Sequence, residues 1–276
     1  STAEALNDNL IAINNIFIQG ETIMLNLNAK KLRRIAIVLA MVAAAMMTIL
    51  SVAVFADTGD TAAAGEAAAA AATTTGLKAI AAGIAIGLAG FGFLASGIQS
   101  EAYGPLFGSI LFCFGLLTVV GYKLKLYTGT AGFIVKGELG MLVMILLGNI
   151  FGCFCTSLLA RVSPMDIQGA AQKILELRLR TGALRCGLLG IGCGMMMTTA
   201  VRFAREKHYL PLLLAVPLFI VCGFTHCIAD AFYYCCVPFS FLKAHALEVL
   251  GVYGCIVLGN LVGCNLYRIV LAKDQY

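Results

Sequence analysis

Residues 222–230 read Cys-Gly-Phe-Thr-His-Cys-Ile-Ala-Asp and interrupt the long apolar run of residues 210–241. They place His226, together with Thr225 and Asp230, at the depth of the middle of a membrane. An ionisable side chain at that depth is costly and marks a functional site by default. A helix that is broken there is tolerated only where it is buried in protein or lines a cavity. The stretch therefore predicts the waist of a pore.

The composition is that of a membrane protein. Of the 276 residues, 61% are hydrophobic and 12% are charged, whereas a soluble domain carries about a quarter charged residues. We therefore expect an all-α, multi-pass protein of the cell membrane, with the lipid bilayer as its main surroundings. The net charge of +5 comes from basic residues at segment ends. That placement is typical of membrane topology signals and not of nucleic-acid binding.

Cysteines are abundant, but their positions argue against metal chemistry. All eleven lie in or beside apolar segments, and none has the paired spacing of a zinc site. We expect them to be small packing residues between helices. The chain also lacks motifs for phosphate binding, a nucleophile elbow or a zinc hydrolase. The sequence thus predicts no metal, no cofactor and no enzymatic activity.

Six apolar segments are predicted to cross the membrane. They span residues 76–98, 103–120, 139–160, 182–204, 210–241 and 247–271. The second segment runs into a polar interruption at residues 121–130, which parallels the interruption of the fifth. A charged connection at residues 161–181 shows apolar residues at helical spacing and predicts a short surface helix.

A repeated motif relates the two halves of the chain. The sequence Leu-Gly-Asn-Ile-Phe-Gly-Cys at 147–153 recurs as Leu-Gly-Asn-Leu-Val-Gly-Cys at 258–264. The chain is then two repeats of three spans, and because three is odd the second repeat enters the membrane with opposite polarity. Inverted repeats with paired interrupted helices place a substrate site near the midplane. We expect Thr128 and His226, one from each interruption, to face each other there.

Other groups near the two interruptions have expected roles as well. Asn149 and Asn260 are expected to bridge helices and to cap the broken segments. Backbone N–H groups at the starts of the half-helices are expected to point their positive dipole ends at an anion.

This pattern resembles the formate/nitrite transporter family. The resemblance covers residues 76–271 and rests on four motifs taken in order: Leu-Tyr-Thr-Gly at 126–129, Gly-Asn at 148–149 and again at 259–260, and Gly-Phe-Thr-His-Cys-Ile-Ala-Asp at 223–230. It implies an aquaporin-like protomer, a homopentamer with one pore per protomer, and passage of small monovalent anions. Formate, nitrite and hydrosulfide are the substrates of the family, and some members carry lactate.

The resemblance assigns roles to individual residues. His226 corresponds to the central pore histidine of the family, and Thr128 to the threonine of the loop that faces it. Phe112 and Leu116 on the second span and Phe219 on the fifth correspond to apolar constriction residues of the family.

Two departures from the family pattern lie beside the histidine. Thr225 replaces a frequent glutamate, and Asp230 replaces an asparagine. Asp230 follows His226 by one helical turn, so we hypothesise that its carboxylate partly replaces the missing glutamate and favours the protonated histidine.

Two mechanisms remain open for a pore of this kind. His226 could hand a proton to the anion, which would then cross the apolar ring as a neutral acid, and this would make passage pH-gated or proton-coupled. Alternatively, neutral His226 could select anions directly. A third possibility, from another class, is an aquaporin-like channel for small neutral solutes. Such a channel should carry Asn-Pro-Ala at each half-helix, and this chain has none.

Residues 1–75 are predicted to form an N-terminal extension of the pore domain, which occupies residues 76–276. A basic cluster at 30–34 precedes the apolar segment 35–56, which reads as a leader or as an extra helix. The Ala-rich residues 57–75 are expected to form a linker. Basic residues occur on both sides of the core spans, so the charges of the loops do not decide the orientation.

Overall fold

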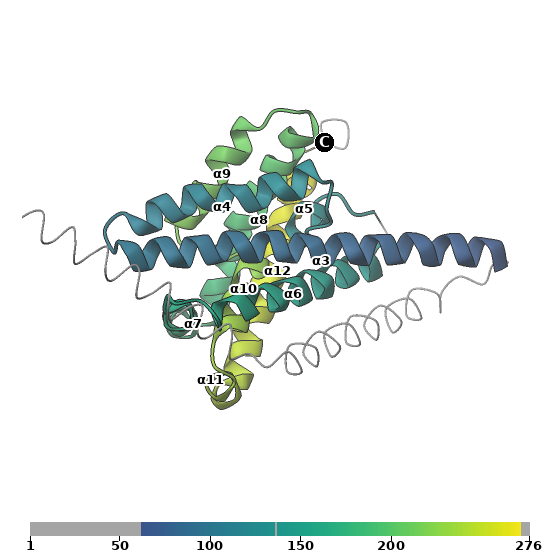
Figure 1. Cartoon of the computed structure of the whole chain (residues 1–276). Coiled ribbons are helices and arrows are strands. Elements are labelled where there is room, and N and C mark those ends of the chain that lie inside the picture. The colour runs from purple at the N-terminus through teal and green to yellow at the C-terminus, as the bar shows by residue number, and fades with distance from the viewer. Residues whose placement is uncertain (1–61, 136, 272–276) are drawn as a thin grey trace, which may run out of the picture.

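The computed structural model describes residues 62–135 and 137–271, and every structural statement below refers to these residues. The predictions for the apolar segment 35–56 lie outside them. The described residues are nearly all helical (Figure 1). In chain order the helices are α3 (Ala62–Gln99), α4 (Gly104–Gly121), α5 (Tyr127–Ala131), α6 (Leu139–Ala160), α7 (Ile167–Thr181), α8 (Ala183–Arg205), α9 (Leu210–Val221), α10 (Cys227–Cys236), α11 (Phe239–Ala244) and α12 (Ala246–Val270).

The fold is that of a multi-pass membrane protein. In the described part, five helices are long and apolar enough to cross a bilayer, namely α3, α4, α6, α8 and α12. The apolar helices α9 and α10 are shorter and follow each other in the chain. The predicted all-α membrane fold is therefore confirmed, while a sixth crossing made by α9 and α10 together stays a prediction.

Two boundaries differ from those predicted. Helix α3 begins at Ala62, so the prediction of a linker is wrong from that residue on. Alanine is the best helix former and extends the helix backwards from the apolar span. The fifth apolar run does not continue to Phe241, because α10 ends at Cys236. Val237 is extended, as the residue before a proline prefers to be, and a new short helix starts after Pro238. The predicted surface helix is α7.

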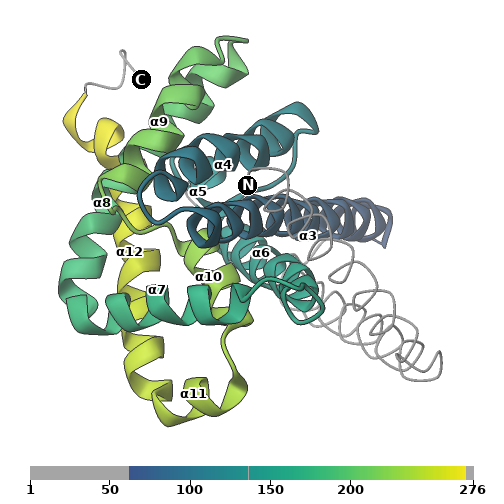
Figure 2. The same ribbon diagram turned by 60° about the vertical axis from the view of Figure 1, so that its left-hand side comes forward.

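Two helix pairs with very close contacts form the frame of the molecule. Helix α3 packs along α6, and α8 packs along α12 (Figures 1 and 2). The Cα atom of Gly83 in α3 faces the backbone carbonyl of Asn149, and Gly194 in α8 faces that of Asn260 in the same way. Glycine allows such an approach because it has no Cβ atom. Because these two contacts are equivalent, they align Gly83 with Gly194 and Asn149 with Asn260, which sets the register between the two repeats.

The second repeat is inverted relative to the first. The backbone N–H of Lys125 donates to the carbonyl of Lys78, which places the first half of α3 beside the segment that follows α4. Arg205, at the end of α8, lines the same cavity as Lys125. The early part of α3 and the end of α8 therefore lie at the same mouth of the bundle, so these equivalent helices run in opposite directions.

A glycine on α12 allows a test of the close packing between α8 and α12. We expect Gly263→Ala to destabilise the protein by about 2–3 kcal/mol, because the added Cβ would overlap the backbone carbonyl of Ile191 in α8. Gly254→Ala is the matched control, since that Cβ would meet no described atom within 4 Å. The control should be neutral or slightly stabilising, by up to about 1 kcal/mol. Thermal unfolding in detergent would compare the two, and equal melting temperatures would contradict the close packing of α8 and α12.

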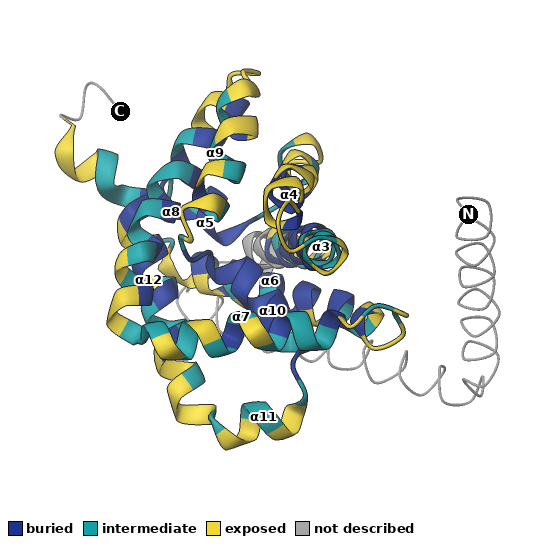
Figure 3. Ribbon diagram, turned by 90° about the vertical axis from the view of Figure 1, so that its left-hand side faces the viewer, coloured by how far each residue is buried: buried dark blue, intermediate teal, exposed yellow. Residues whose placement is uncertain are grey.

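The outer faces of the bundle are apolar, while small and polar residues lie inside. Burial is greatest around α5 and α10, at the centre of the bundle (Figure 3). Large apolar side chains are exposed on α4 and α9, including Phe107, Leu111 and Phe114 on the first and Leu214 and Leu218 on the second. An exposed apolar surface of this kind suits lipid or a neighbouring subunit.

Candidate functional site at the centre of the bundle

The two predicted interruptions adopt the same backbone path. After α4 and α9 the chain turns back through residues with positive φ, 52° at Lys123 and 70° at Gly223. The chain then becomes extended at Leu126 and at His226, which are the N-cap residues of α5 and α10. The side chain of His226 thereby occupies in the second repeat the position that Leu126 has in the first.

Asn149 holds the first interruption in place. Its Oδ1 accepts a hydrogen bond of 2.8 Å from the backbone N–H of Tyr127. Its Nδ2 donates to the carbonyls of Ala79, at 2.7 Å, and of Lys125, at 2.9 Å. One fully buried side chain thus joins α6 to α3 and caps the half-helix α5.

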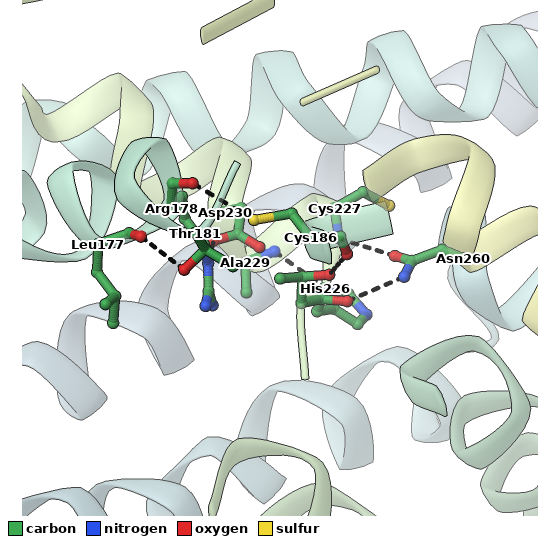
Figure 4. Close-up of polar contacts among 10 residues, drawn as sticks. Leu177, Arg178, Thr181, Cys186, His226, Cys227, Ala229, Asp230 and Asn260 are labelled. Carbon is green, nitrogen blue, oxygen red and sulfur yellow. Dashed lines mark hydrogen bonds and ion pairs between the residues drawn. The ribbon is translucent and has the colours of Figure 1, made fainter. Parts of the chain in front are cut away.

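Asn260 makes the equivalent contacts in the second repeat (Figure 4). Its Oδ1 accepts from the backbone N–H of Cys227 at 2.8 Å. Its Nδ2 donates to the carbonyls of Gly190 and Thr225, both at 2.9 Å. The asparagines therefore make the bridging and capping contacts that the sequence predicted for them.

His226 and Thr128 meet in the interior, one from each repeat. The His226 Nε2 lies 3.0 Å from the Thr128 Oγ1, and the residues are 2% and 0% exposed. The His226 Nδ1 accepts a hydrogen bond of 3.1 Å from the backbone N–H of Ala229. An accepting Nδ1 carries no proton, so this network assigns a neutral ring with its proton on Nε2. That proton is donated to Thr128.

Aromatic rings cover one side of the histidine. The Phe219 ring stacks on His226 with 5.7 Å between centroids and 28° between planes. The Phe112 ring meets Phe219 edge to face, with 6.2 Å between centroids. Leu116 is buried one turn after Phe112 on α4. The structure thus places two of the three predicted constriction residues in a row beside His226, and their role as a gate stays a prediction.

Three amides at the starts of the half-helices are bonded within the protein. The N–H of Cys227 donates to Asn260, and the N–H of Ala229 donates to His226. In the first repeat the N–H of Tyr127 donates to Asn149. These three amides are therefore bonded within the protein and do not face an anion, since buried polar groups find protein partners. For the other amides at the starts of α5 and α10 the expectation stays a prediction.

Thr225 and Asp230 point away from the histidine ring. The Thr225 hydroxyl donates to the carbonyl of Cys186 at 2.7 Å. The Asp230 Oδ1 lies 3.0 Å from the Arg178 Nε in a buried ion pair, which Figure 4 shows beside the start of α10. The hypothesis that Asp230 acts on His226 is therefore wrong, because the carboxylate is already paired with a cation from α7.

Sequence reasoning missed Arg178, which it assigned to a charged surface connection. Burial by itself would lower the pKa of the guanidinium, but the charge and the hydrogen bond of Asp230 outweigh it and raise that pKa above the ordinary value. The second carboxylate oxygen of Asp230 is buried and has no hydrogen-bond partner among the described residues.

Two cysteines, also missed, link the repeats at the site. The Cys153 thiol donates to the carbonyl of Ile228 at 3.4 Å, and the Cys264 thiol donates to the carbonyl of Thr128 at 3.3 Å. Each cysteine therefore holds the half-helix of the other repeat. Their identical place at the end of the repeated motif was the signal that could have revealed them.

The inverted frame, the two half-helices and the buried polar pair between them form the arrangement of a membrane transport protein. The sequence profile described as formate/nitrite transporter matches residues 58–272. The chain belongs to the formate/nitrite transporter family.

Comparison with solved structures agrees with this fold. A structure described as a pentameric formate channel with formate bound has 24% sequence identity and a TM-score of 0.61, and the match covers 72% of this chain and 94% of that one. A structure described as an FNT family ion channel has 17% identity and a TM-score of 0.59, with 83% and 94% covered. No curated protein matches the sequence.

Proposed function

We propose that this protein conducts small monovalent anions of the formate, nitrite and hydrosulfide type through a pore whose waist is the Thr128–His226 pair. The observation that supports this most strongly is the meeting of two side-chain donors in a buried apolar setting, 3.0 Å apart. An anion that loses water needs hydrogen bonds to replace its hydration. A similar protein is described as a formate channel with formate bound, which supports the same class of substrate.

The waist would bind the anion through both donors. At rest, the Nε2–H of His226 donates to Thr128 Oγ1, which leaves the hydroxyl proton of Thr128 free to point elsewhere. An arriving anion would accept from both groups and replace the bond between them. Phe112 and Phe219 would keep water away on one side, because apolar constrictions gate by excluding water.

The neutral form of His226 fits this role better than the protonated form. A protonated ring would carry a proton on Nδ1, which would break the hydrogen bond from Ala229 at the first turn of α10. We therefore favour direct selection by a neutral donor over proton transfer from the ring. Passage of a neutral acid would then need a proton taken from water outside the waist.

The same proposal covers the assembly. A homopentamer in the cell membrane, with one pore in each protomer, agrees with the description of the similar formate channel as pentameric. The exposed apolar faces of α4 and α9 offer surface for subunit or lipid contacts.

Flux assays in proteoliposomes would test the function. We expect uptake of at least one of formate, nitrite and hydrosulfide, and no uptake of glycerol above that of protein-free vesicles. Thr128→Val should lower anion flux about tenfold, the loss expected for one hydrogen bond to a charged group. Thr128→Ser keeps the hydroxyl and is the control, with flux near that of the wild type. Uptake of glycerol without uptake of any anion would instead establish the aquaporin-like alternative.

A further inference from the structure

One mouth of the pore opens into a strongly basic cavity of about 510 Å³. Four basic residues line it, from the segment after α4 and from the end of α8 with the turn that follows: Lys123, Lys125, Arg205 and Lys207. No acidic residue of the described chain is among the lining residues. The cavity also reaches Leu126 and Gly129, the neighbours of Thr128, so it leads towards the waist. We name this cavity the basic vestibule.

The backbone conformation and local contacts set the positions of these four basic residues. Lys123 and Lys207 have positive φ angles of 52° and 66°, which fix the tight turns that present them to the cavity. Lys125 is half-buried beside α3, where its N–H is bonded to Lys78. The Arg205 guanidinium lies 3.7 Å from the centre of the Phe133 ring. It keeps its charge in this position.

The internal repeat shows that the positions equivalent to these four are uncharged at the opposite mouth. The backbone turn at Lys123 is repeated at Gly223, and the carbonyls of Lys125 and Thr225 accept from the equivalent asparagines. Lys123 and Lys125 of the basic vestibule therefore correspond to the uncharged residues Gly223 and Thr225 in the second repeat.

The other two basic positions are uncharged in the first repeat. In the register fixed by the glycine contacts of α3 and α8, Arg205 aligns with Leu94 and Lys207 aligns with Ser96. All four basic positions of one mouth therefore correspond to uncharged residues at the other.

On the opposite side of the site, the buried cation Arg178 is neutralised by a carboxylate. Arg178 is only 14% exposed in its side chain and pairs with Asp230, which is 1% exposed, at 3.0 Å. The second oxygen of Asp230 has no hydrogen-bond partner among the described residues. The pair of Arg178 and Asp230 carries no net charge, so it adds no attraction for an anion.

We propose that the basic vestibule is an anion-loading site, which makes the pore electrically asymmetric. This inference rests on the proposed function and adds a direction to it. A basic cleft raises the local concentration of anions, and the gain is largest at low ionic strength. The half-saturating anion concentration is therefore lower from the basic vestibule than from the opposite mouth.

The test uses vesicles of one orientation. Helix α12 ends on the side of the basic vestibule, where Arg268 donates to the carbonyl of Ile134. An affinity tag at the C-terminus then selects vesicles in which this mouth faces outwards, and the remaining vesicles present the opposite mouth. Initial uptake of labelled formate is measured into each at equal pH and without a membrane potential.

For the wild type we expect a half-saturating concentration about tenfold lower from the basic vestibule at an ionic strength of about 10 mM. The difference should nearly vanish at about 0.5 M, where screening is strong. A passive pore must have the same ratio of maximal flux to half-saturating concentration in both directions. The maximal uptake from the basic vestibule should therefore be lower by the same factor.

Charge-removing variants identify the source of the asymmetry. The double change Lys123→Asn and Lys207→Asn should reduce the tenfold difference to about twofold, and asparagine tolerates the positive φ at both positions. The double change Lys173→Asn and Lys243→Asn removes two exposed charges on the opposite side and is the matched control, with the asymmetry retained. Asp230→Asn leaves Arg178 uncompensated and should also reduce the difference, by improving uptake from the opposite mouth.

Three results separate failure of this inference from failure of the function. Measurable formate uptake with equal half-saturating concentrations from both sides at low ionic strength would overturn the loading site and leave the anion pore intact. An asymmetry unchanged by the Lys123/Lys207 variant would overturn it as well. Absence of uptake of formate, nitrite and hydrosulfide by folded protein would overturn the proposed function itself.

Discussion

Replacing His226 by asparagine should lower anion flux about 10- to 100-fold while the protein stays folded. The range corresponds to the roughly 1.5–3 kcal/mol that a hydrogen bond to a charged group contributes. His226 has two separate tasks in the structure. Its Nδ1 caps α10 by accepting from Ala229, and its Nε2–H reaches Thr128 in the other repeat.

Asparagine separates these two tasks. It is a strong N-cap residue whose side-chain oxygen can accept from the N–H of Ala229, but it is too short to reach Thr128 while it does so. His226→Phe removes both the cap and the donor and is the comparison. We expect both variants to lose flux, and we expect only His226→Phe to lower the melting temperature, by the roughly 1 kcal/mol that a cap contributes.

Flux and thermal unfolding should be measured on the same preparations. Full flux in His226→Asn would reduce His226 to a capping residue and would leave the pore without its proposed donor. The dependence of wild-type flux on pH adds a second check. A neutral donor predicts that flux follows the concentration of the transported species, whereas proton transfer from the ring predicts an additional pH dependence that His226→Asn abolishes.

The sequence was most informative where the two repeats could be compared. The paired interruptions predicted that Thr128 and His226 would meet, and they lie 3.0 Å apart. The repeated Gly-Asn motif predicted the bridging of Asn149 and Asn260, because a buried amide in a membrane needs several partners. Each of these inferences depended on short-range patterns that occur twice, so the second copy supported the first.

Long-range partners were beyond the sequence. Arg178 lies on a helix with a polar outer face, and nothing local shows that its side chain turns inwards to Asp230. Asp230 follows His226 by one turn, which predicted a contact between them, yet side chains one turn apart on a helix can contact different neighbours. The basic vestibule could not be predicted for the same reason, since Lys125 and Arg205 come from different repeats and line one cavity only in the folded chain.

The second large effect is expected at Asn260, on stability. Asn260→Ala should destabilise the protein by about 3 kcal/mol or more, because three hydrogen bonds are lost at about 1 kcal/mol each and the partners stay buried. Those partners are the N–H of Cys227 and the carbonyls of Gly190 and Thr225. Loss of the first would free the start of α10, and His226 with it.

Asn260→Asp shows which half of the amide matters. The aspartate has nearly the same volume and keeps an acceptor for Cys227, but its second oxygen faces two carbonyls that need donors. We expect it to be at least as destabilising as the alanine variant at neutral pH, since an ionised carboxylate is buried there without a cation.

Asn265→Ala is the control on the same helix. Asn265 is half-buried and donates to the carbonyls of Ala131 and Leu261, where water can take over after its removal. Its loss should cost no more than about 1 kcal/mol. Thermal unfolding in detergent and the fraction of intact oligomer would be measured for the three variants. Equal stability of Asn260→Ala and Asn265→Ala would show that the interrupted helix is held by packing instead of by the buried amide.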